Sequence, residues 1–330
     1  MKKSDKCKCD NLHKTSVGGQ ALIEGIMMQG PKGAAMAVRL PDGSIDLEEK
    51  TVKHIKDKYK FFGIPIIRGI TAFVESMLFG YKCIMESAEK SGLEDMDNDT
   101  ENMSKLDKWI SEHWSEKAMS IITGIASVIG IALAFVLFFW LPTFVVNIIK
   151  THTAFDLTNY RALLEGVMRM IIFICYMALV SQMKDIKRVF MYHGAEHKTI
   201  FCYEHGLDLT VENVKKQSRF HPRCGTSFMF VMIILSVLVS SAVSIVFPHL
   251  RDVTVLWMIV KIALLPIVMG LGYEFIKYAG KHDNLCVKIL SAPGLWMQRI
   301  TTKEPDESMI EVGIAAFKAV ITDNPEDDAI

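Results

Sequence analysis

The chain has 330 residues, half of them hydrophobic, and equal numbers of acidic and basic side chains give it a formal net charge of zero. Its length alone allows two soluble domains, but the apolar residues are not distributed as two soluble cores require. Residues 118–149 and 226–248 contain no charged side chain, and about 20 mostly apolar residues suffice to cross a bilayer. Nothing in this charge balance predicts a nucleic-acid partner.

The first 60 residues predict a polar tail followed by a small β unit. Residues 1–14 are polar and predict a disordered tail. In residues 15–60, Ala34–Leu40 and Ser44–Val52 flank Pro41-Asp42-Gly43, which favours a tight turn. Glycines crowd the preceding segment, but the Lys-Ser/Thr ending of a phosphate-binding loop is missing, so they predict tight turns and close backbone packing.

Residues 61–90 predict a long amphipathic or interfacial helix. Arg68, Glu75 and Lys82 are spaced by seven residues, nearly two helical turns, so they share one face. Such a helix can lie in the membrane interface, dip into the bilayer, or be buried in the cytoplasmic part, and the sequence leaves these alternatives open. Residues 91–116 are acidic and poor in apolar side chains, which predicts a flexible linker.

Four apolar stretches predict a helical bundle built from two transmembrane hairpins, residues 117–183 and 228–273. The first stretch exceeds one straight span, and Pro142 predicts that it bends or ends there. The second and fourth stretches each contain isolated charges, so they identify spans less clearly than the other two.

These isolated charges are Glu165, Arg169 and Lys261. A charge inside a membrane is expected to face the bundle interior and to have a partner. Glu165 and Arg169 are four residues apart, which predicts an ion pair between them. Lys261 is expected to face the same interior, toward Glu165. The three can mark a polar pathway or a buried structural pair, and the sequence does not choose.

Basic residues next to the spans predict the orientation. The segment 184–223 contains eight lysines and arginines, whereas the connections on the other side offer only Lys150, Arg161 and Arg251. The bias predicts a multi-pass protein of the cell membrane with both termini in the cytoplasm. Residues 184–227 are then a cytoplasmic loop, and residues 274–330 a cytoplasmic segment with a helix over 306–320.

The first chemical motif of this loop is His193-Gly194-Ala195-Glu196-His197. On a helix, two histidines four residues apart and the glutamate between them project from one face, close enough to share a metal ion and its water. The spacing matches the H-x-x-E-H pattern of one class of metalloproteases. The alternative is a pair of surface histidines in a basic helix. Gly194 weakens the helix and predicts close packing beside the motif.

A second cluster, His221-Pro222-Arg223-Cys224, lies in the same loop. Imidazole nitrogen and thiolate sulfur are both good zinc ligands, and Arg223 beside Cys224 would favour the thiolate. A Cys/His nucleophile pair is a further possibility. The alternative without chemistry is a turn that leads into the third span.

Two more candidates follow the fourth span. Glu274 can be a third ligand or a general base at the membrane edge, or it can pair with Lys277 or Arg223. Asp283 can orient His282 as a supporting partner of a metal site, or the two can simply end a helix.

Six segments, in order along the chain, resemble the YqhQ-like family of bacterial membrane proteins. They are Gly18–Pro31, Ile64–Gly69, Tyr192–Thr199, His221–Phe228, Tyr273–Asn284 and Pro293–Pro305. The resemblance covers almost the whole chain. It implies a membrane protein of a family described as predicted metal-dependent enzymes, and it implies no substrate.

These observations predict a mainly α-helical, polytopic bundle of about four spans with a small N-terminal β unit and an amphipathic helix. A divalent metal, most plausibly zinc, is expected at the cytoplasmic membrane face. The candidate ligands are His193, His197, His221 and Cys224, the candidate bases are Glu196 and Glu274, and the supporting residues are Arg223, His282 and Asp283.

The predicted function is a zinc-dependent membrane enzyme that hydrolyses a lipid-linked or peptide substrate. Two other classes stay open. One is a scaffold with a structural zinc site that binds a cytoplasmic protein partner, and a closed ligand shell would distinguish it. The other is a transporter component that uses the intramembrane charges, for which a homo-oligomer could supply further spans. Membrane lipids are expected partners in each case.

Overall fold

The computed structural model describes residues 13–52, 54–92, 116–152, 160–251, 253–282, 284–322 and 324–329. The tail predicted over residues 1–14 and the linker predicted over residues 91–116 lie almost entirely outside these ranges. Asp283 also lies outside them, so its predicted role stays a prediction.

Four antiparallel strands near the N-terminus form one meander in the order β1-β2-β3-β4. They are β1 (Gly18–Leu22), β2 (Gly25–Gly30), β3 (Gly33–Arg39) and β4 (Ile45–Lys50). In the predicted turn between β3 and β4, the N–H of Gly43 donates to the carbonyl of Leu40 over 2.9 Å. The φ of Gly43 is +86°, a region that favours glycine. The predicted small β unit is therefore confirmed.

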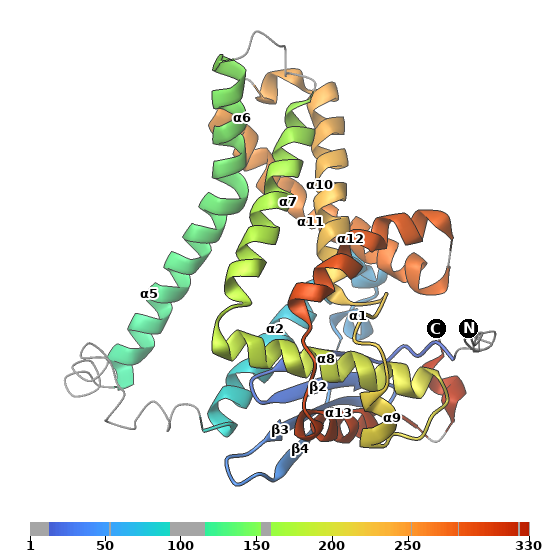
Figure 1. Ribbon diagram of the computed structural model, residues 1–330. Helices are drawn as coiled ribbons and strands as arrows, with labels where there is room; N and C mark the ends of the chain where they lie inside the picture. The colour runs from blue at the N-terminus through green and yellow to red at the C-terminus, as the bar shows by residue number, and fades with distance from the viewer. Residues whose placement is uncertain are drawn as a thin grey trace, which may run out of the picture.

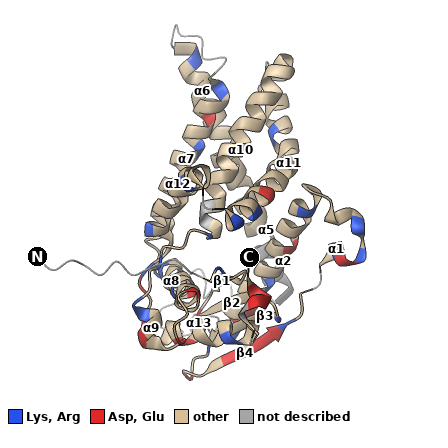
Figure 2. Cartoon of the chain, turned by 90° about the vertical axis from the view of Figure 1, so that its right-hand side faces the viewer, with Lys and Arg blue, Asp and Glu red and all other residues tan. Residues whose placement is uncertain are grey.

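Helices cover both faces of the sheet (Figures 1 and 2). Because successive side chains of a strand point to opposite faces, Met36 packs toward Cys83 of one helix, whereas Met28 packs toward Tyr192 and Phe317 on the other side. The first face carries α2 (Ile67–Lys90), which follows α1 (Ile55–Lys58) and the short η1 (Lys60–Gly63). The second carries α8 (Lys184–Glu204), α9 (Val211–Lys215) and α13 (Glu307–Val320). We call the sheet, α8, α9 and α13, together with the connection between α8 and α9, the extramembrane unit.

Helix α13 begins where the sequence predicts. Asp306 caps it, because its carboxylate accepts from the N–H of Met309 over 2.9 Å. The apolar stripe of α13, which includes Ile310 and Phe317, is buried against the sheet and α8. Residues 184–227 are not an open loop: helices α8 and α9 form most of that segment.

Four helices are long and apolar enough to cross a membrane, as the sequence predicts: Gly124–His152, Arg161–Val180, Phe228–Val246 and Thr254–Lys281. They are formed by α5 (Glu116–Phe135), η2 (Val136–Trp140) and α6 (Leu141–His152), by α7 (Arg161–Val180), by α10 (Gly225–Val246) and by α11 (Thr254–Lys281). They stand on one side of the extramembrane unit (Figure 1).

The first span passes through Pro142 by way of η2, a π-helical segment. Proline has no N–H to donate to the carbonyl four residues earlier, which is that of Phe138. Nε of Arg169, on α7, donates to this carbonyl over 2.9 Å, and its Nη1 donates to Oγ of Ser236 on α10 over 3.1 Å. The guanidinium therefore links three spans and compensates for the missing bond at the proline.

Of the two partners expected for Glu165, Lys261 contacts it and Arg169 does not. Its buried carboxylate pairs with Nζ of Lys261, as expected, but its second partner is Nε of Arg161 at 3.1 Å. Lys261 also donates to Oγ1 of Thr143 over 2.9 Å. The predicted pair between Glu165 and Arg169 is wrong, because the guanidinium of Arg169 makes the contacts described above.

The helix after α11 lies against the spans. This helix, α12 (Leu285–Thr301), packs Met297 against Phe173 of α7 and Phe230 of α10. Short helices complete the chain: η3 (Pro248–Arg251) connects α10 to α11, and η4 (Pro325–Asp328) follows α13. Near the end of the chain, Ala329 pairs with Thr15, so the first and last described residues lie side by side.

We predict that replacing Lys261 by methionine lowers the thermal unfolding temperature of the detergent-purified protein. Removing one partner of a buried ion pair leaves an uncompensated charge, which costs about 3–5 kcal/mol, and Arg161 offsets part of that cost. The double variant Glu165→Gln/Lys261→Met should recover most of the loss, because it removes both charges. Equal instability of the single and double variants would show that Lys261 matters for its shape and not for its charge.

Candidate metal centre

His193 and His197 lie one turn apart on α8, with ring centroids 4.4 Å from each other. Nδ1 of His193 is 2.8 Å from the carbonyl oxygen of Thr301, and Nδ1 of His197 is 2.6 Å from that of Arg219. Since a carbonyl oxygen only accepts, each Nδ1 carries a proton and each Nε2 presents a lone pair. Metal-binding histidines usually have this arrangement, with the second nitrogen held by a carbonyl or a carboxylate.

Cys224 adds a sulfur to the two imidazoles. Its Sγ lies 3.3 Å from Nε2 of His193, so the thiol can donate to that lone pair. One ligand atom from each of His193, His197 and Cys224 lies within 4.8 Å of the other two. Cys224 immediately precedes α10, whose N-terminal partial positive charge favours a thiolate over a thiol. We call these three residues the His-His-Cys cluster.

Glu196, between the two histidines on α8, is a buried carboxylate beside the cluster. Only 5% of it is exposed, and among the described residues its Oε2 has no hydrogen-bond partner. Burial raises its pKa to about 7, although the charge of His193 and a hydrogen bond from the N–H of Gly19 act in the opposite direction. A side chain on Gly19 would collide with the carbonyl oxygen of Met27, 2.7 Å from an added Cβ, and would lie only 3.1 Å from Cδ of Glu196.

His221 lies next to the cluster and faces the other way. Its ring is 5.6 Å from that of His197, but its Nε2 is 3.3 Å from Oε2 of Glu204. Burial is the main cause that lowers the pKa values of His197 and His221. Arg223 also pairs with Glu204. Its guanidinium is therefore not directed at Cys224, in contrast to what the sequence predicts. His221 and Arg223 therefore border the cluster, and His221 contributes no ligand atom to it.

Contacts that the sequence does not reveal hold the cluster in place. Buried Gln298 on α12 accepts from the N–H of His221 over 2.8 Å and donates to its carbonyl over 2.7 Å. Gly194 has the predicted close packing, because an added Cβ would lie 2.1 Å from the carbonyl oxygen of Lys303. Sequence patterns do not identify Glu204 as the partner of His221, although its place seven residues after His197 puts both on one face of α8.

Two predicted site residues lie elsewhere. Glu274, on α11, forms an ion pair with Arg68 of α2 in which Nε donates to Oε1 over 2.6 Å. It is therefore neither a ligand nor a base of the cluster, and its partner is neither Lys277 nor Arg223. His282 is exposed, stacks on Tyr278 and lies 3.0 Å from the Tyr278 carbonyl oxygen through Nδ1. It ends α11, as the alternative interpretation proposed.

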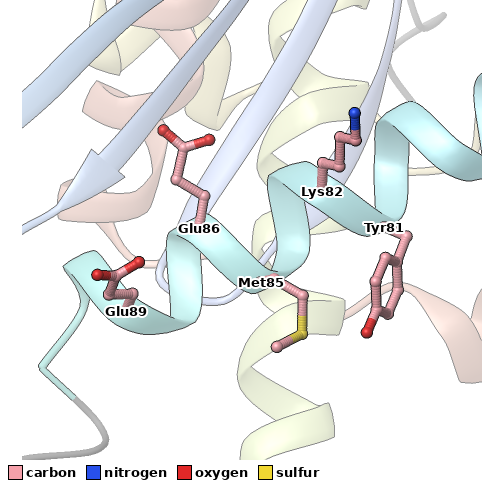
Figure 3. Close-up of a pocket in the computed structure, with 5 residues that line it drawn as sticks. All are labelled: Tyr81, Lys82, Met85, Glu86 and Glu89. Atoms are coloured by element: carbon pink, nitrogen blue, oxygen red, sulfur yellow. The ribbon is translucent and has the colours of Figure 1, made fainter.

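Two surface hollows offer less chemistry. One, of 350 Å³, is lined by side chains of a single helix, α2: Tyr81, Lys82, Met85, Glu86 and Glu89 (Figure 3). The other, of 460 Å³, is lined by polar groups of β1 and β2 that include Gly19 and Gln20. Through Gly19 this second hollow borders the strand that contacts Glu196. Neither contains a histidine or a cysteine.

The fold and the cluster define a class: four helices fit to cross a membrane, with a His-His-Cys cluster where an extramembrane unit of helices and strands meets them. The chain belongs to the family described as protein of unknown function (DUF1385), whose model matches residues 64–323. It is similar to the uncharacterized protein YqhQ of Bacillus subtilis (strain 168), with 35% identity over 306 residues, 92% of each chain. No solved structure matches it. The YqhQ-like resemblance is therefore confirmed as family membership.

We predict that Glu196→Gln stabilises the chelator-treated protein at pH 8 but not at pH 4. Glu196 has its pKa raised from 4.5 to about 7 in the folded state. The stability contributed by its neutral form is fully present below pH 4.5 and is lost as pH rises through 7. Glutamine does not titrate, so it avoids a penalty on the order of 3 kcal/mol at pH 8.

Thermal unfolding of both proteins across this pH range measures the effect. The lowered pKa values of His197 and His221 act in both proteins, so they cancel in the comparison. A stability difference that does not change between pH 4 and pH 8 would mean that the carboxyl group does not titrate in this window.

Proposed function

We propose that the protein is a zinc-dependent membrane enzyme whose metal is held by His193, His197 and Cys224. The observation that carries this proposal is the pair of Nδ1 contacts to backbone carbonyls, which leave both Nε2 lone pairs beside the Cys224 sulfur. Two imidazoles and a thiolate suit zinc better than the oxygen-preferring Mg²⁺ or Ca²⁺. The unpartnered Oε2 of Glu196 at the edge of the cluster also fits, because a buried acceptor needs a donor such as a water.

Three protein ligands argue for catalysis over structure. Structural zinc sites are closed by four protein ligands, whereas catalytic sites keep one position open. Within the described ranges, the cluster has three residues that offer a ligand atom. The scaffold alternative therefore has less support, and a role as transporter component has less still, because the charges of Glu165 and Lys261 partner each other.

Hydrolysis is the reaction that this arrangement supports best. Bound zinc would supply a Lewis acid that makes a water acidic near neutral pH. Glu196 would accept a proton from that water, since it lies between the two histidines on α8 and its Oε2 has no hydrogen-bond partner among the described residues. The N–H of Gly19 orients the carboxylate, and the carbonyls of Thr301 and Arg219 keep both imidazoles in the required tautomer.

The position of the cluster supports a membrane-borne substrate, lipid-linked or peptide. Cys224 lies four residues before Phe228, where the third span begins. The histidines lie on α8, which starts four residues after the second span ends at Val180. A substrate that reaches the cluster must therefore carry its scissile bond at the membrane surface. By the basic-residue bias, that surface and both termini are cytoplasmic.

A thiol nucleophile is the second candidate, and one contact favours it. Sγ of Cys224 lies 3.3 Å from Nε2 of His193, whose other nitrogen is held by a carbonyl, as in a Cys-His pair with an orienting third group. In that case Cys224 would attack the substrate, and metal would inhibit by occupying the sulfur.

Metal analysis of the detergent-purified protein tests the first proposal. We expect about one zinc per chain in the wild type, and a loss of most of it in His197→Ala and Cys224→Ser. Glu196→Gln should retain zinc, because the carboxylate is a base and not a ligand. His282→Ala is the matched control, an exposed histidine that should leave the zinc content unchanged.

Equal zinc content in wild type and His197→Ala would contradict the metal site. If the wild type then lacks zinc and reacts at Cys224 with iodoacetamide faster than at exposed Cys286, the thiol nucleophile becomes the better proposal.

The orientation has its own test in intact cells. We expect Glu212→Cys, on α9, to be unreactive toward a membrane-impermeant maleimide until the cells are lysed. Val253→Cys, in the connection before α11, should react without lysis, and wild-type cells give the background. Both positions are exposed. The reverse pattern would place the cluster outside the cytoplasm and remove the argument for a cytoplasmic substrate.

A further inference from the structure

We infer that α12 and the segment Tyr59–Ile66 are embedded in the membrane leaflet nearest the extramembrane unit, as an interfacial collar around the spans. The sequence places residues 274–330 in a cytoplasmic segment and leaves residues 61–90 undecided. The inferred partner is the lipid of that leaflet. The inferred position of the two segments does not depend on whether the His-His-Cys cluster binds metal.

The depth of α12 follows from what its inner face contacts. Met297 packs with Phe173 and Phe230, which belong to α7 and α10. The 20 residues of α7 rise about 30 Å, which is the whole hydrocarbon thickness of a bilayer. Phe173 lies seven residues before the end of α7, so it is about 10 Å inside the hydrocarbon. A helix whose buried side reaches Phe173 lies within that leaflet.

The outer face of α12 has the composition that such a position requires. Leu285, Ile289 and Trp296 recur at helical spacing on one face and are 72%, 60% and 69% exposed. Arg299, also exposed, lies on the flank of this stripe. An apolar face with a tryptophan and a flanking arginine is typical of helices that lie in the membrane interface. In Figure 1, α12 lies across the bundle, between the long spans and α8.

The segment Tyr59–Ile66 reaches a similar depth on α11. Gly270 of α11 contacts Ile66 so closely that an added Cβ would lie 2.4 Å from its Cγ2. Gly270 is 16 residues after Thr254, where α11 begins, which is about 24 Å along a helix that crosses about 30 Å of hydrocarbon. Ile66 therefore lies near the inner boundary of the hydrocarbon.

The same segment exposes apolar and basic side chains together. Tyr59, Phe61 and Ile64 are 53%, 61% and 47% exposed, and Lys58 and Lys60 are interleaved with them. Aromatic rings at the level of the headgroups with lysines between them suit a leaflet that contains anionic lipid. A cytosolic protein surface would expose these rings to water at a cost in free energy.

The collar has a consequence for the cluster. The carbonyl of Thr301, the last residue of α12, holds the ring of His193. A displacement of α12 by its contact with lipid would therefore move Thr301, whose carbonyl positions the imidazole of His193. The cluster would sit directly beside the headgroups, where soluble substrates have little access.

Photo-crosslinking in pure lipid vesicles tests this inference. The full chain is reconstituted into vesicles of phosphatidylethanolamine and phosphatidylglycerol, with p-benzoylphenylalanine at Ile289 in one variant and at Phe61 in another. After irradiation, intact mass spectrometry should find an added phospholipid in both. The matched control has the same group at Leu207, an apolar residue that is 42% exposed but belongs to the extramembrane unit. It should form several-fold less lipid adduct.

Three results would overturn the inference. The first is an Ile289 variant with no more lipid adduct than the Leu207 variant. The second is a mass of two chains after irradiation, which would show that a second copy covers the stripe. The third is a lipid adduct at Ile289 only, which would leave the segment Tyr59–Ile66 outside the leaflet. Elution of each variant at the wild-type volume in size-exclusion chromatography ensures that the chains compared are folded.

Discussion

The Nδ1–H groups of His193 and His197 donate to the carbonyls of Thr301 and Arg219, and most of the candidate site depends on these two bonds. A neutral imidazole has one donor and one acceptor nitrogen, so fixing the donor also fixes the direction of the lone pair. Both carbonyls come from segments remote from α8 in sequence. The histidines can therefore face one point only when α12 and the segment before α10 are in place. The rest of the fold, including Gln298 and Gly194, serves that packing.

The buried carboxylate of Glu196 supports the proposed catalytic role of the His-His-Cys cluster. Burying a carboxyl with one oxygen unpartnered costs free energy, and a protein selected for stability alone would place an apolar side chain there. The raised pKa of Glu196 is the expression of that cost. Gly19 belongs to the same contact, because its N–H bonds to the carboxylate and an added Cβ would lie 2.7 Å from the carbonyl oxygen of Met27. Buried groups with perturbed pKa values are typical of functional sites.

Sequence patterns predict the helices, strands and turns of this protein better than they predict which side chains contact each other. The spans, the β3–β4 turn and the helix after Asp306 follow from apolar length, turn residues and capping, which are local properties. The spacing of His193 and His197 correctly puts them on one face of α8. The position of Cys224 beside them depends on how the segment before α10 lies against α8, and nothing local encodes that. Glu274 looks equally suitable in sequence, but Arg68, about 200 residues away, pairs with it.

The intramembrane charges illustrate the same limit. Glu165 and Arg169 have the spacing of an ion pair, and on an isolated helix they would form one. In the bundle, Pro142 leaves the carbonyl of Phe138 without its helical donor, and Arg169 provides the replacement. Glu165 is then available to Lys261. Pro142 in the first span thus accounts for the partner of Arg169 in the second, which the spacing of Glu165 and Arg169 alone does not predict.

The charged contacts between the spans and the apolar contact of α12 lie at different depths in the membrane. Glu165 lies four residues from the start of α7, so the charged contacts link the spans near the end remote from the extramembrane unit. Met297 packs against α7 and α10 near the opposite end. The polar contacts are directional and hold the spans in one arrangement, whereas the apolar contact of α12 is not directional and tolerates small displacements. At this end the directional contacts come from α2 and α12: Arg68 pairs with Glu274 of α11, and Gln298 bonds to both backbone groups of His221.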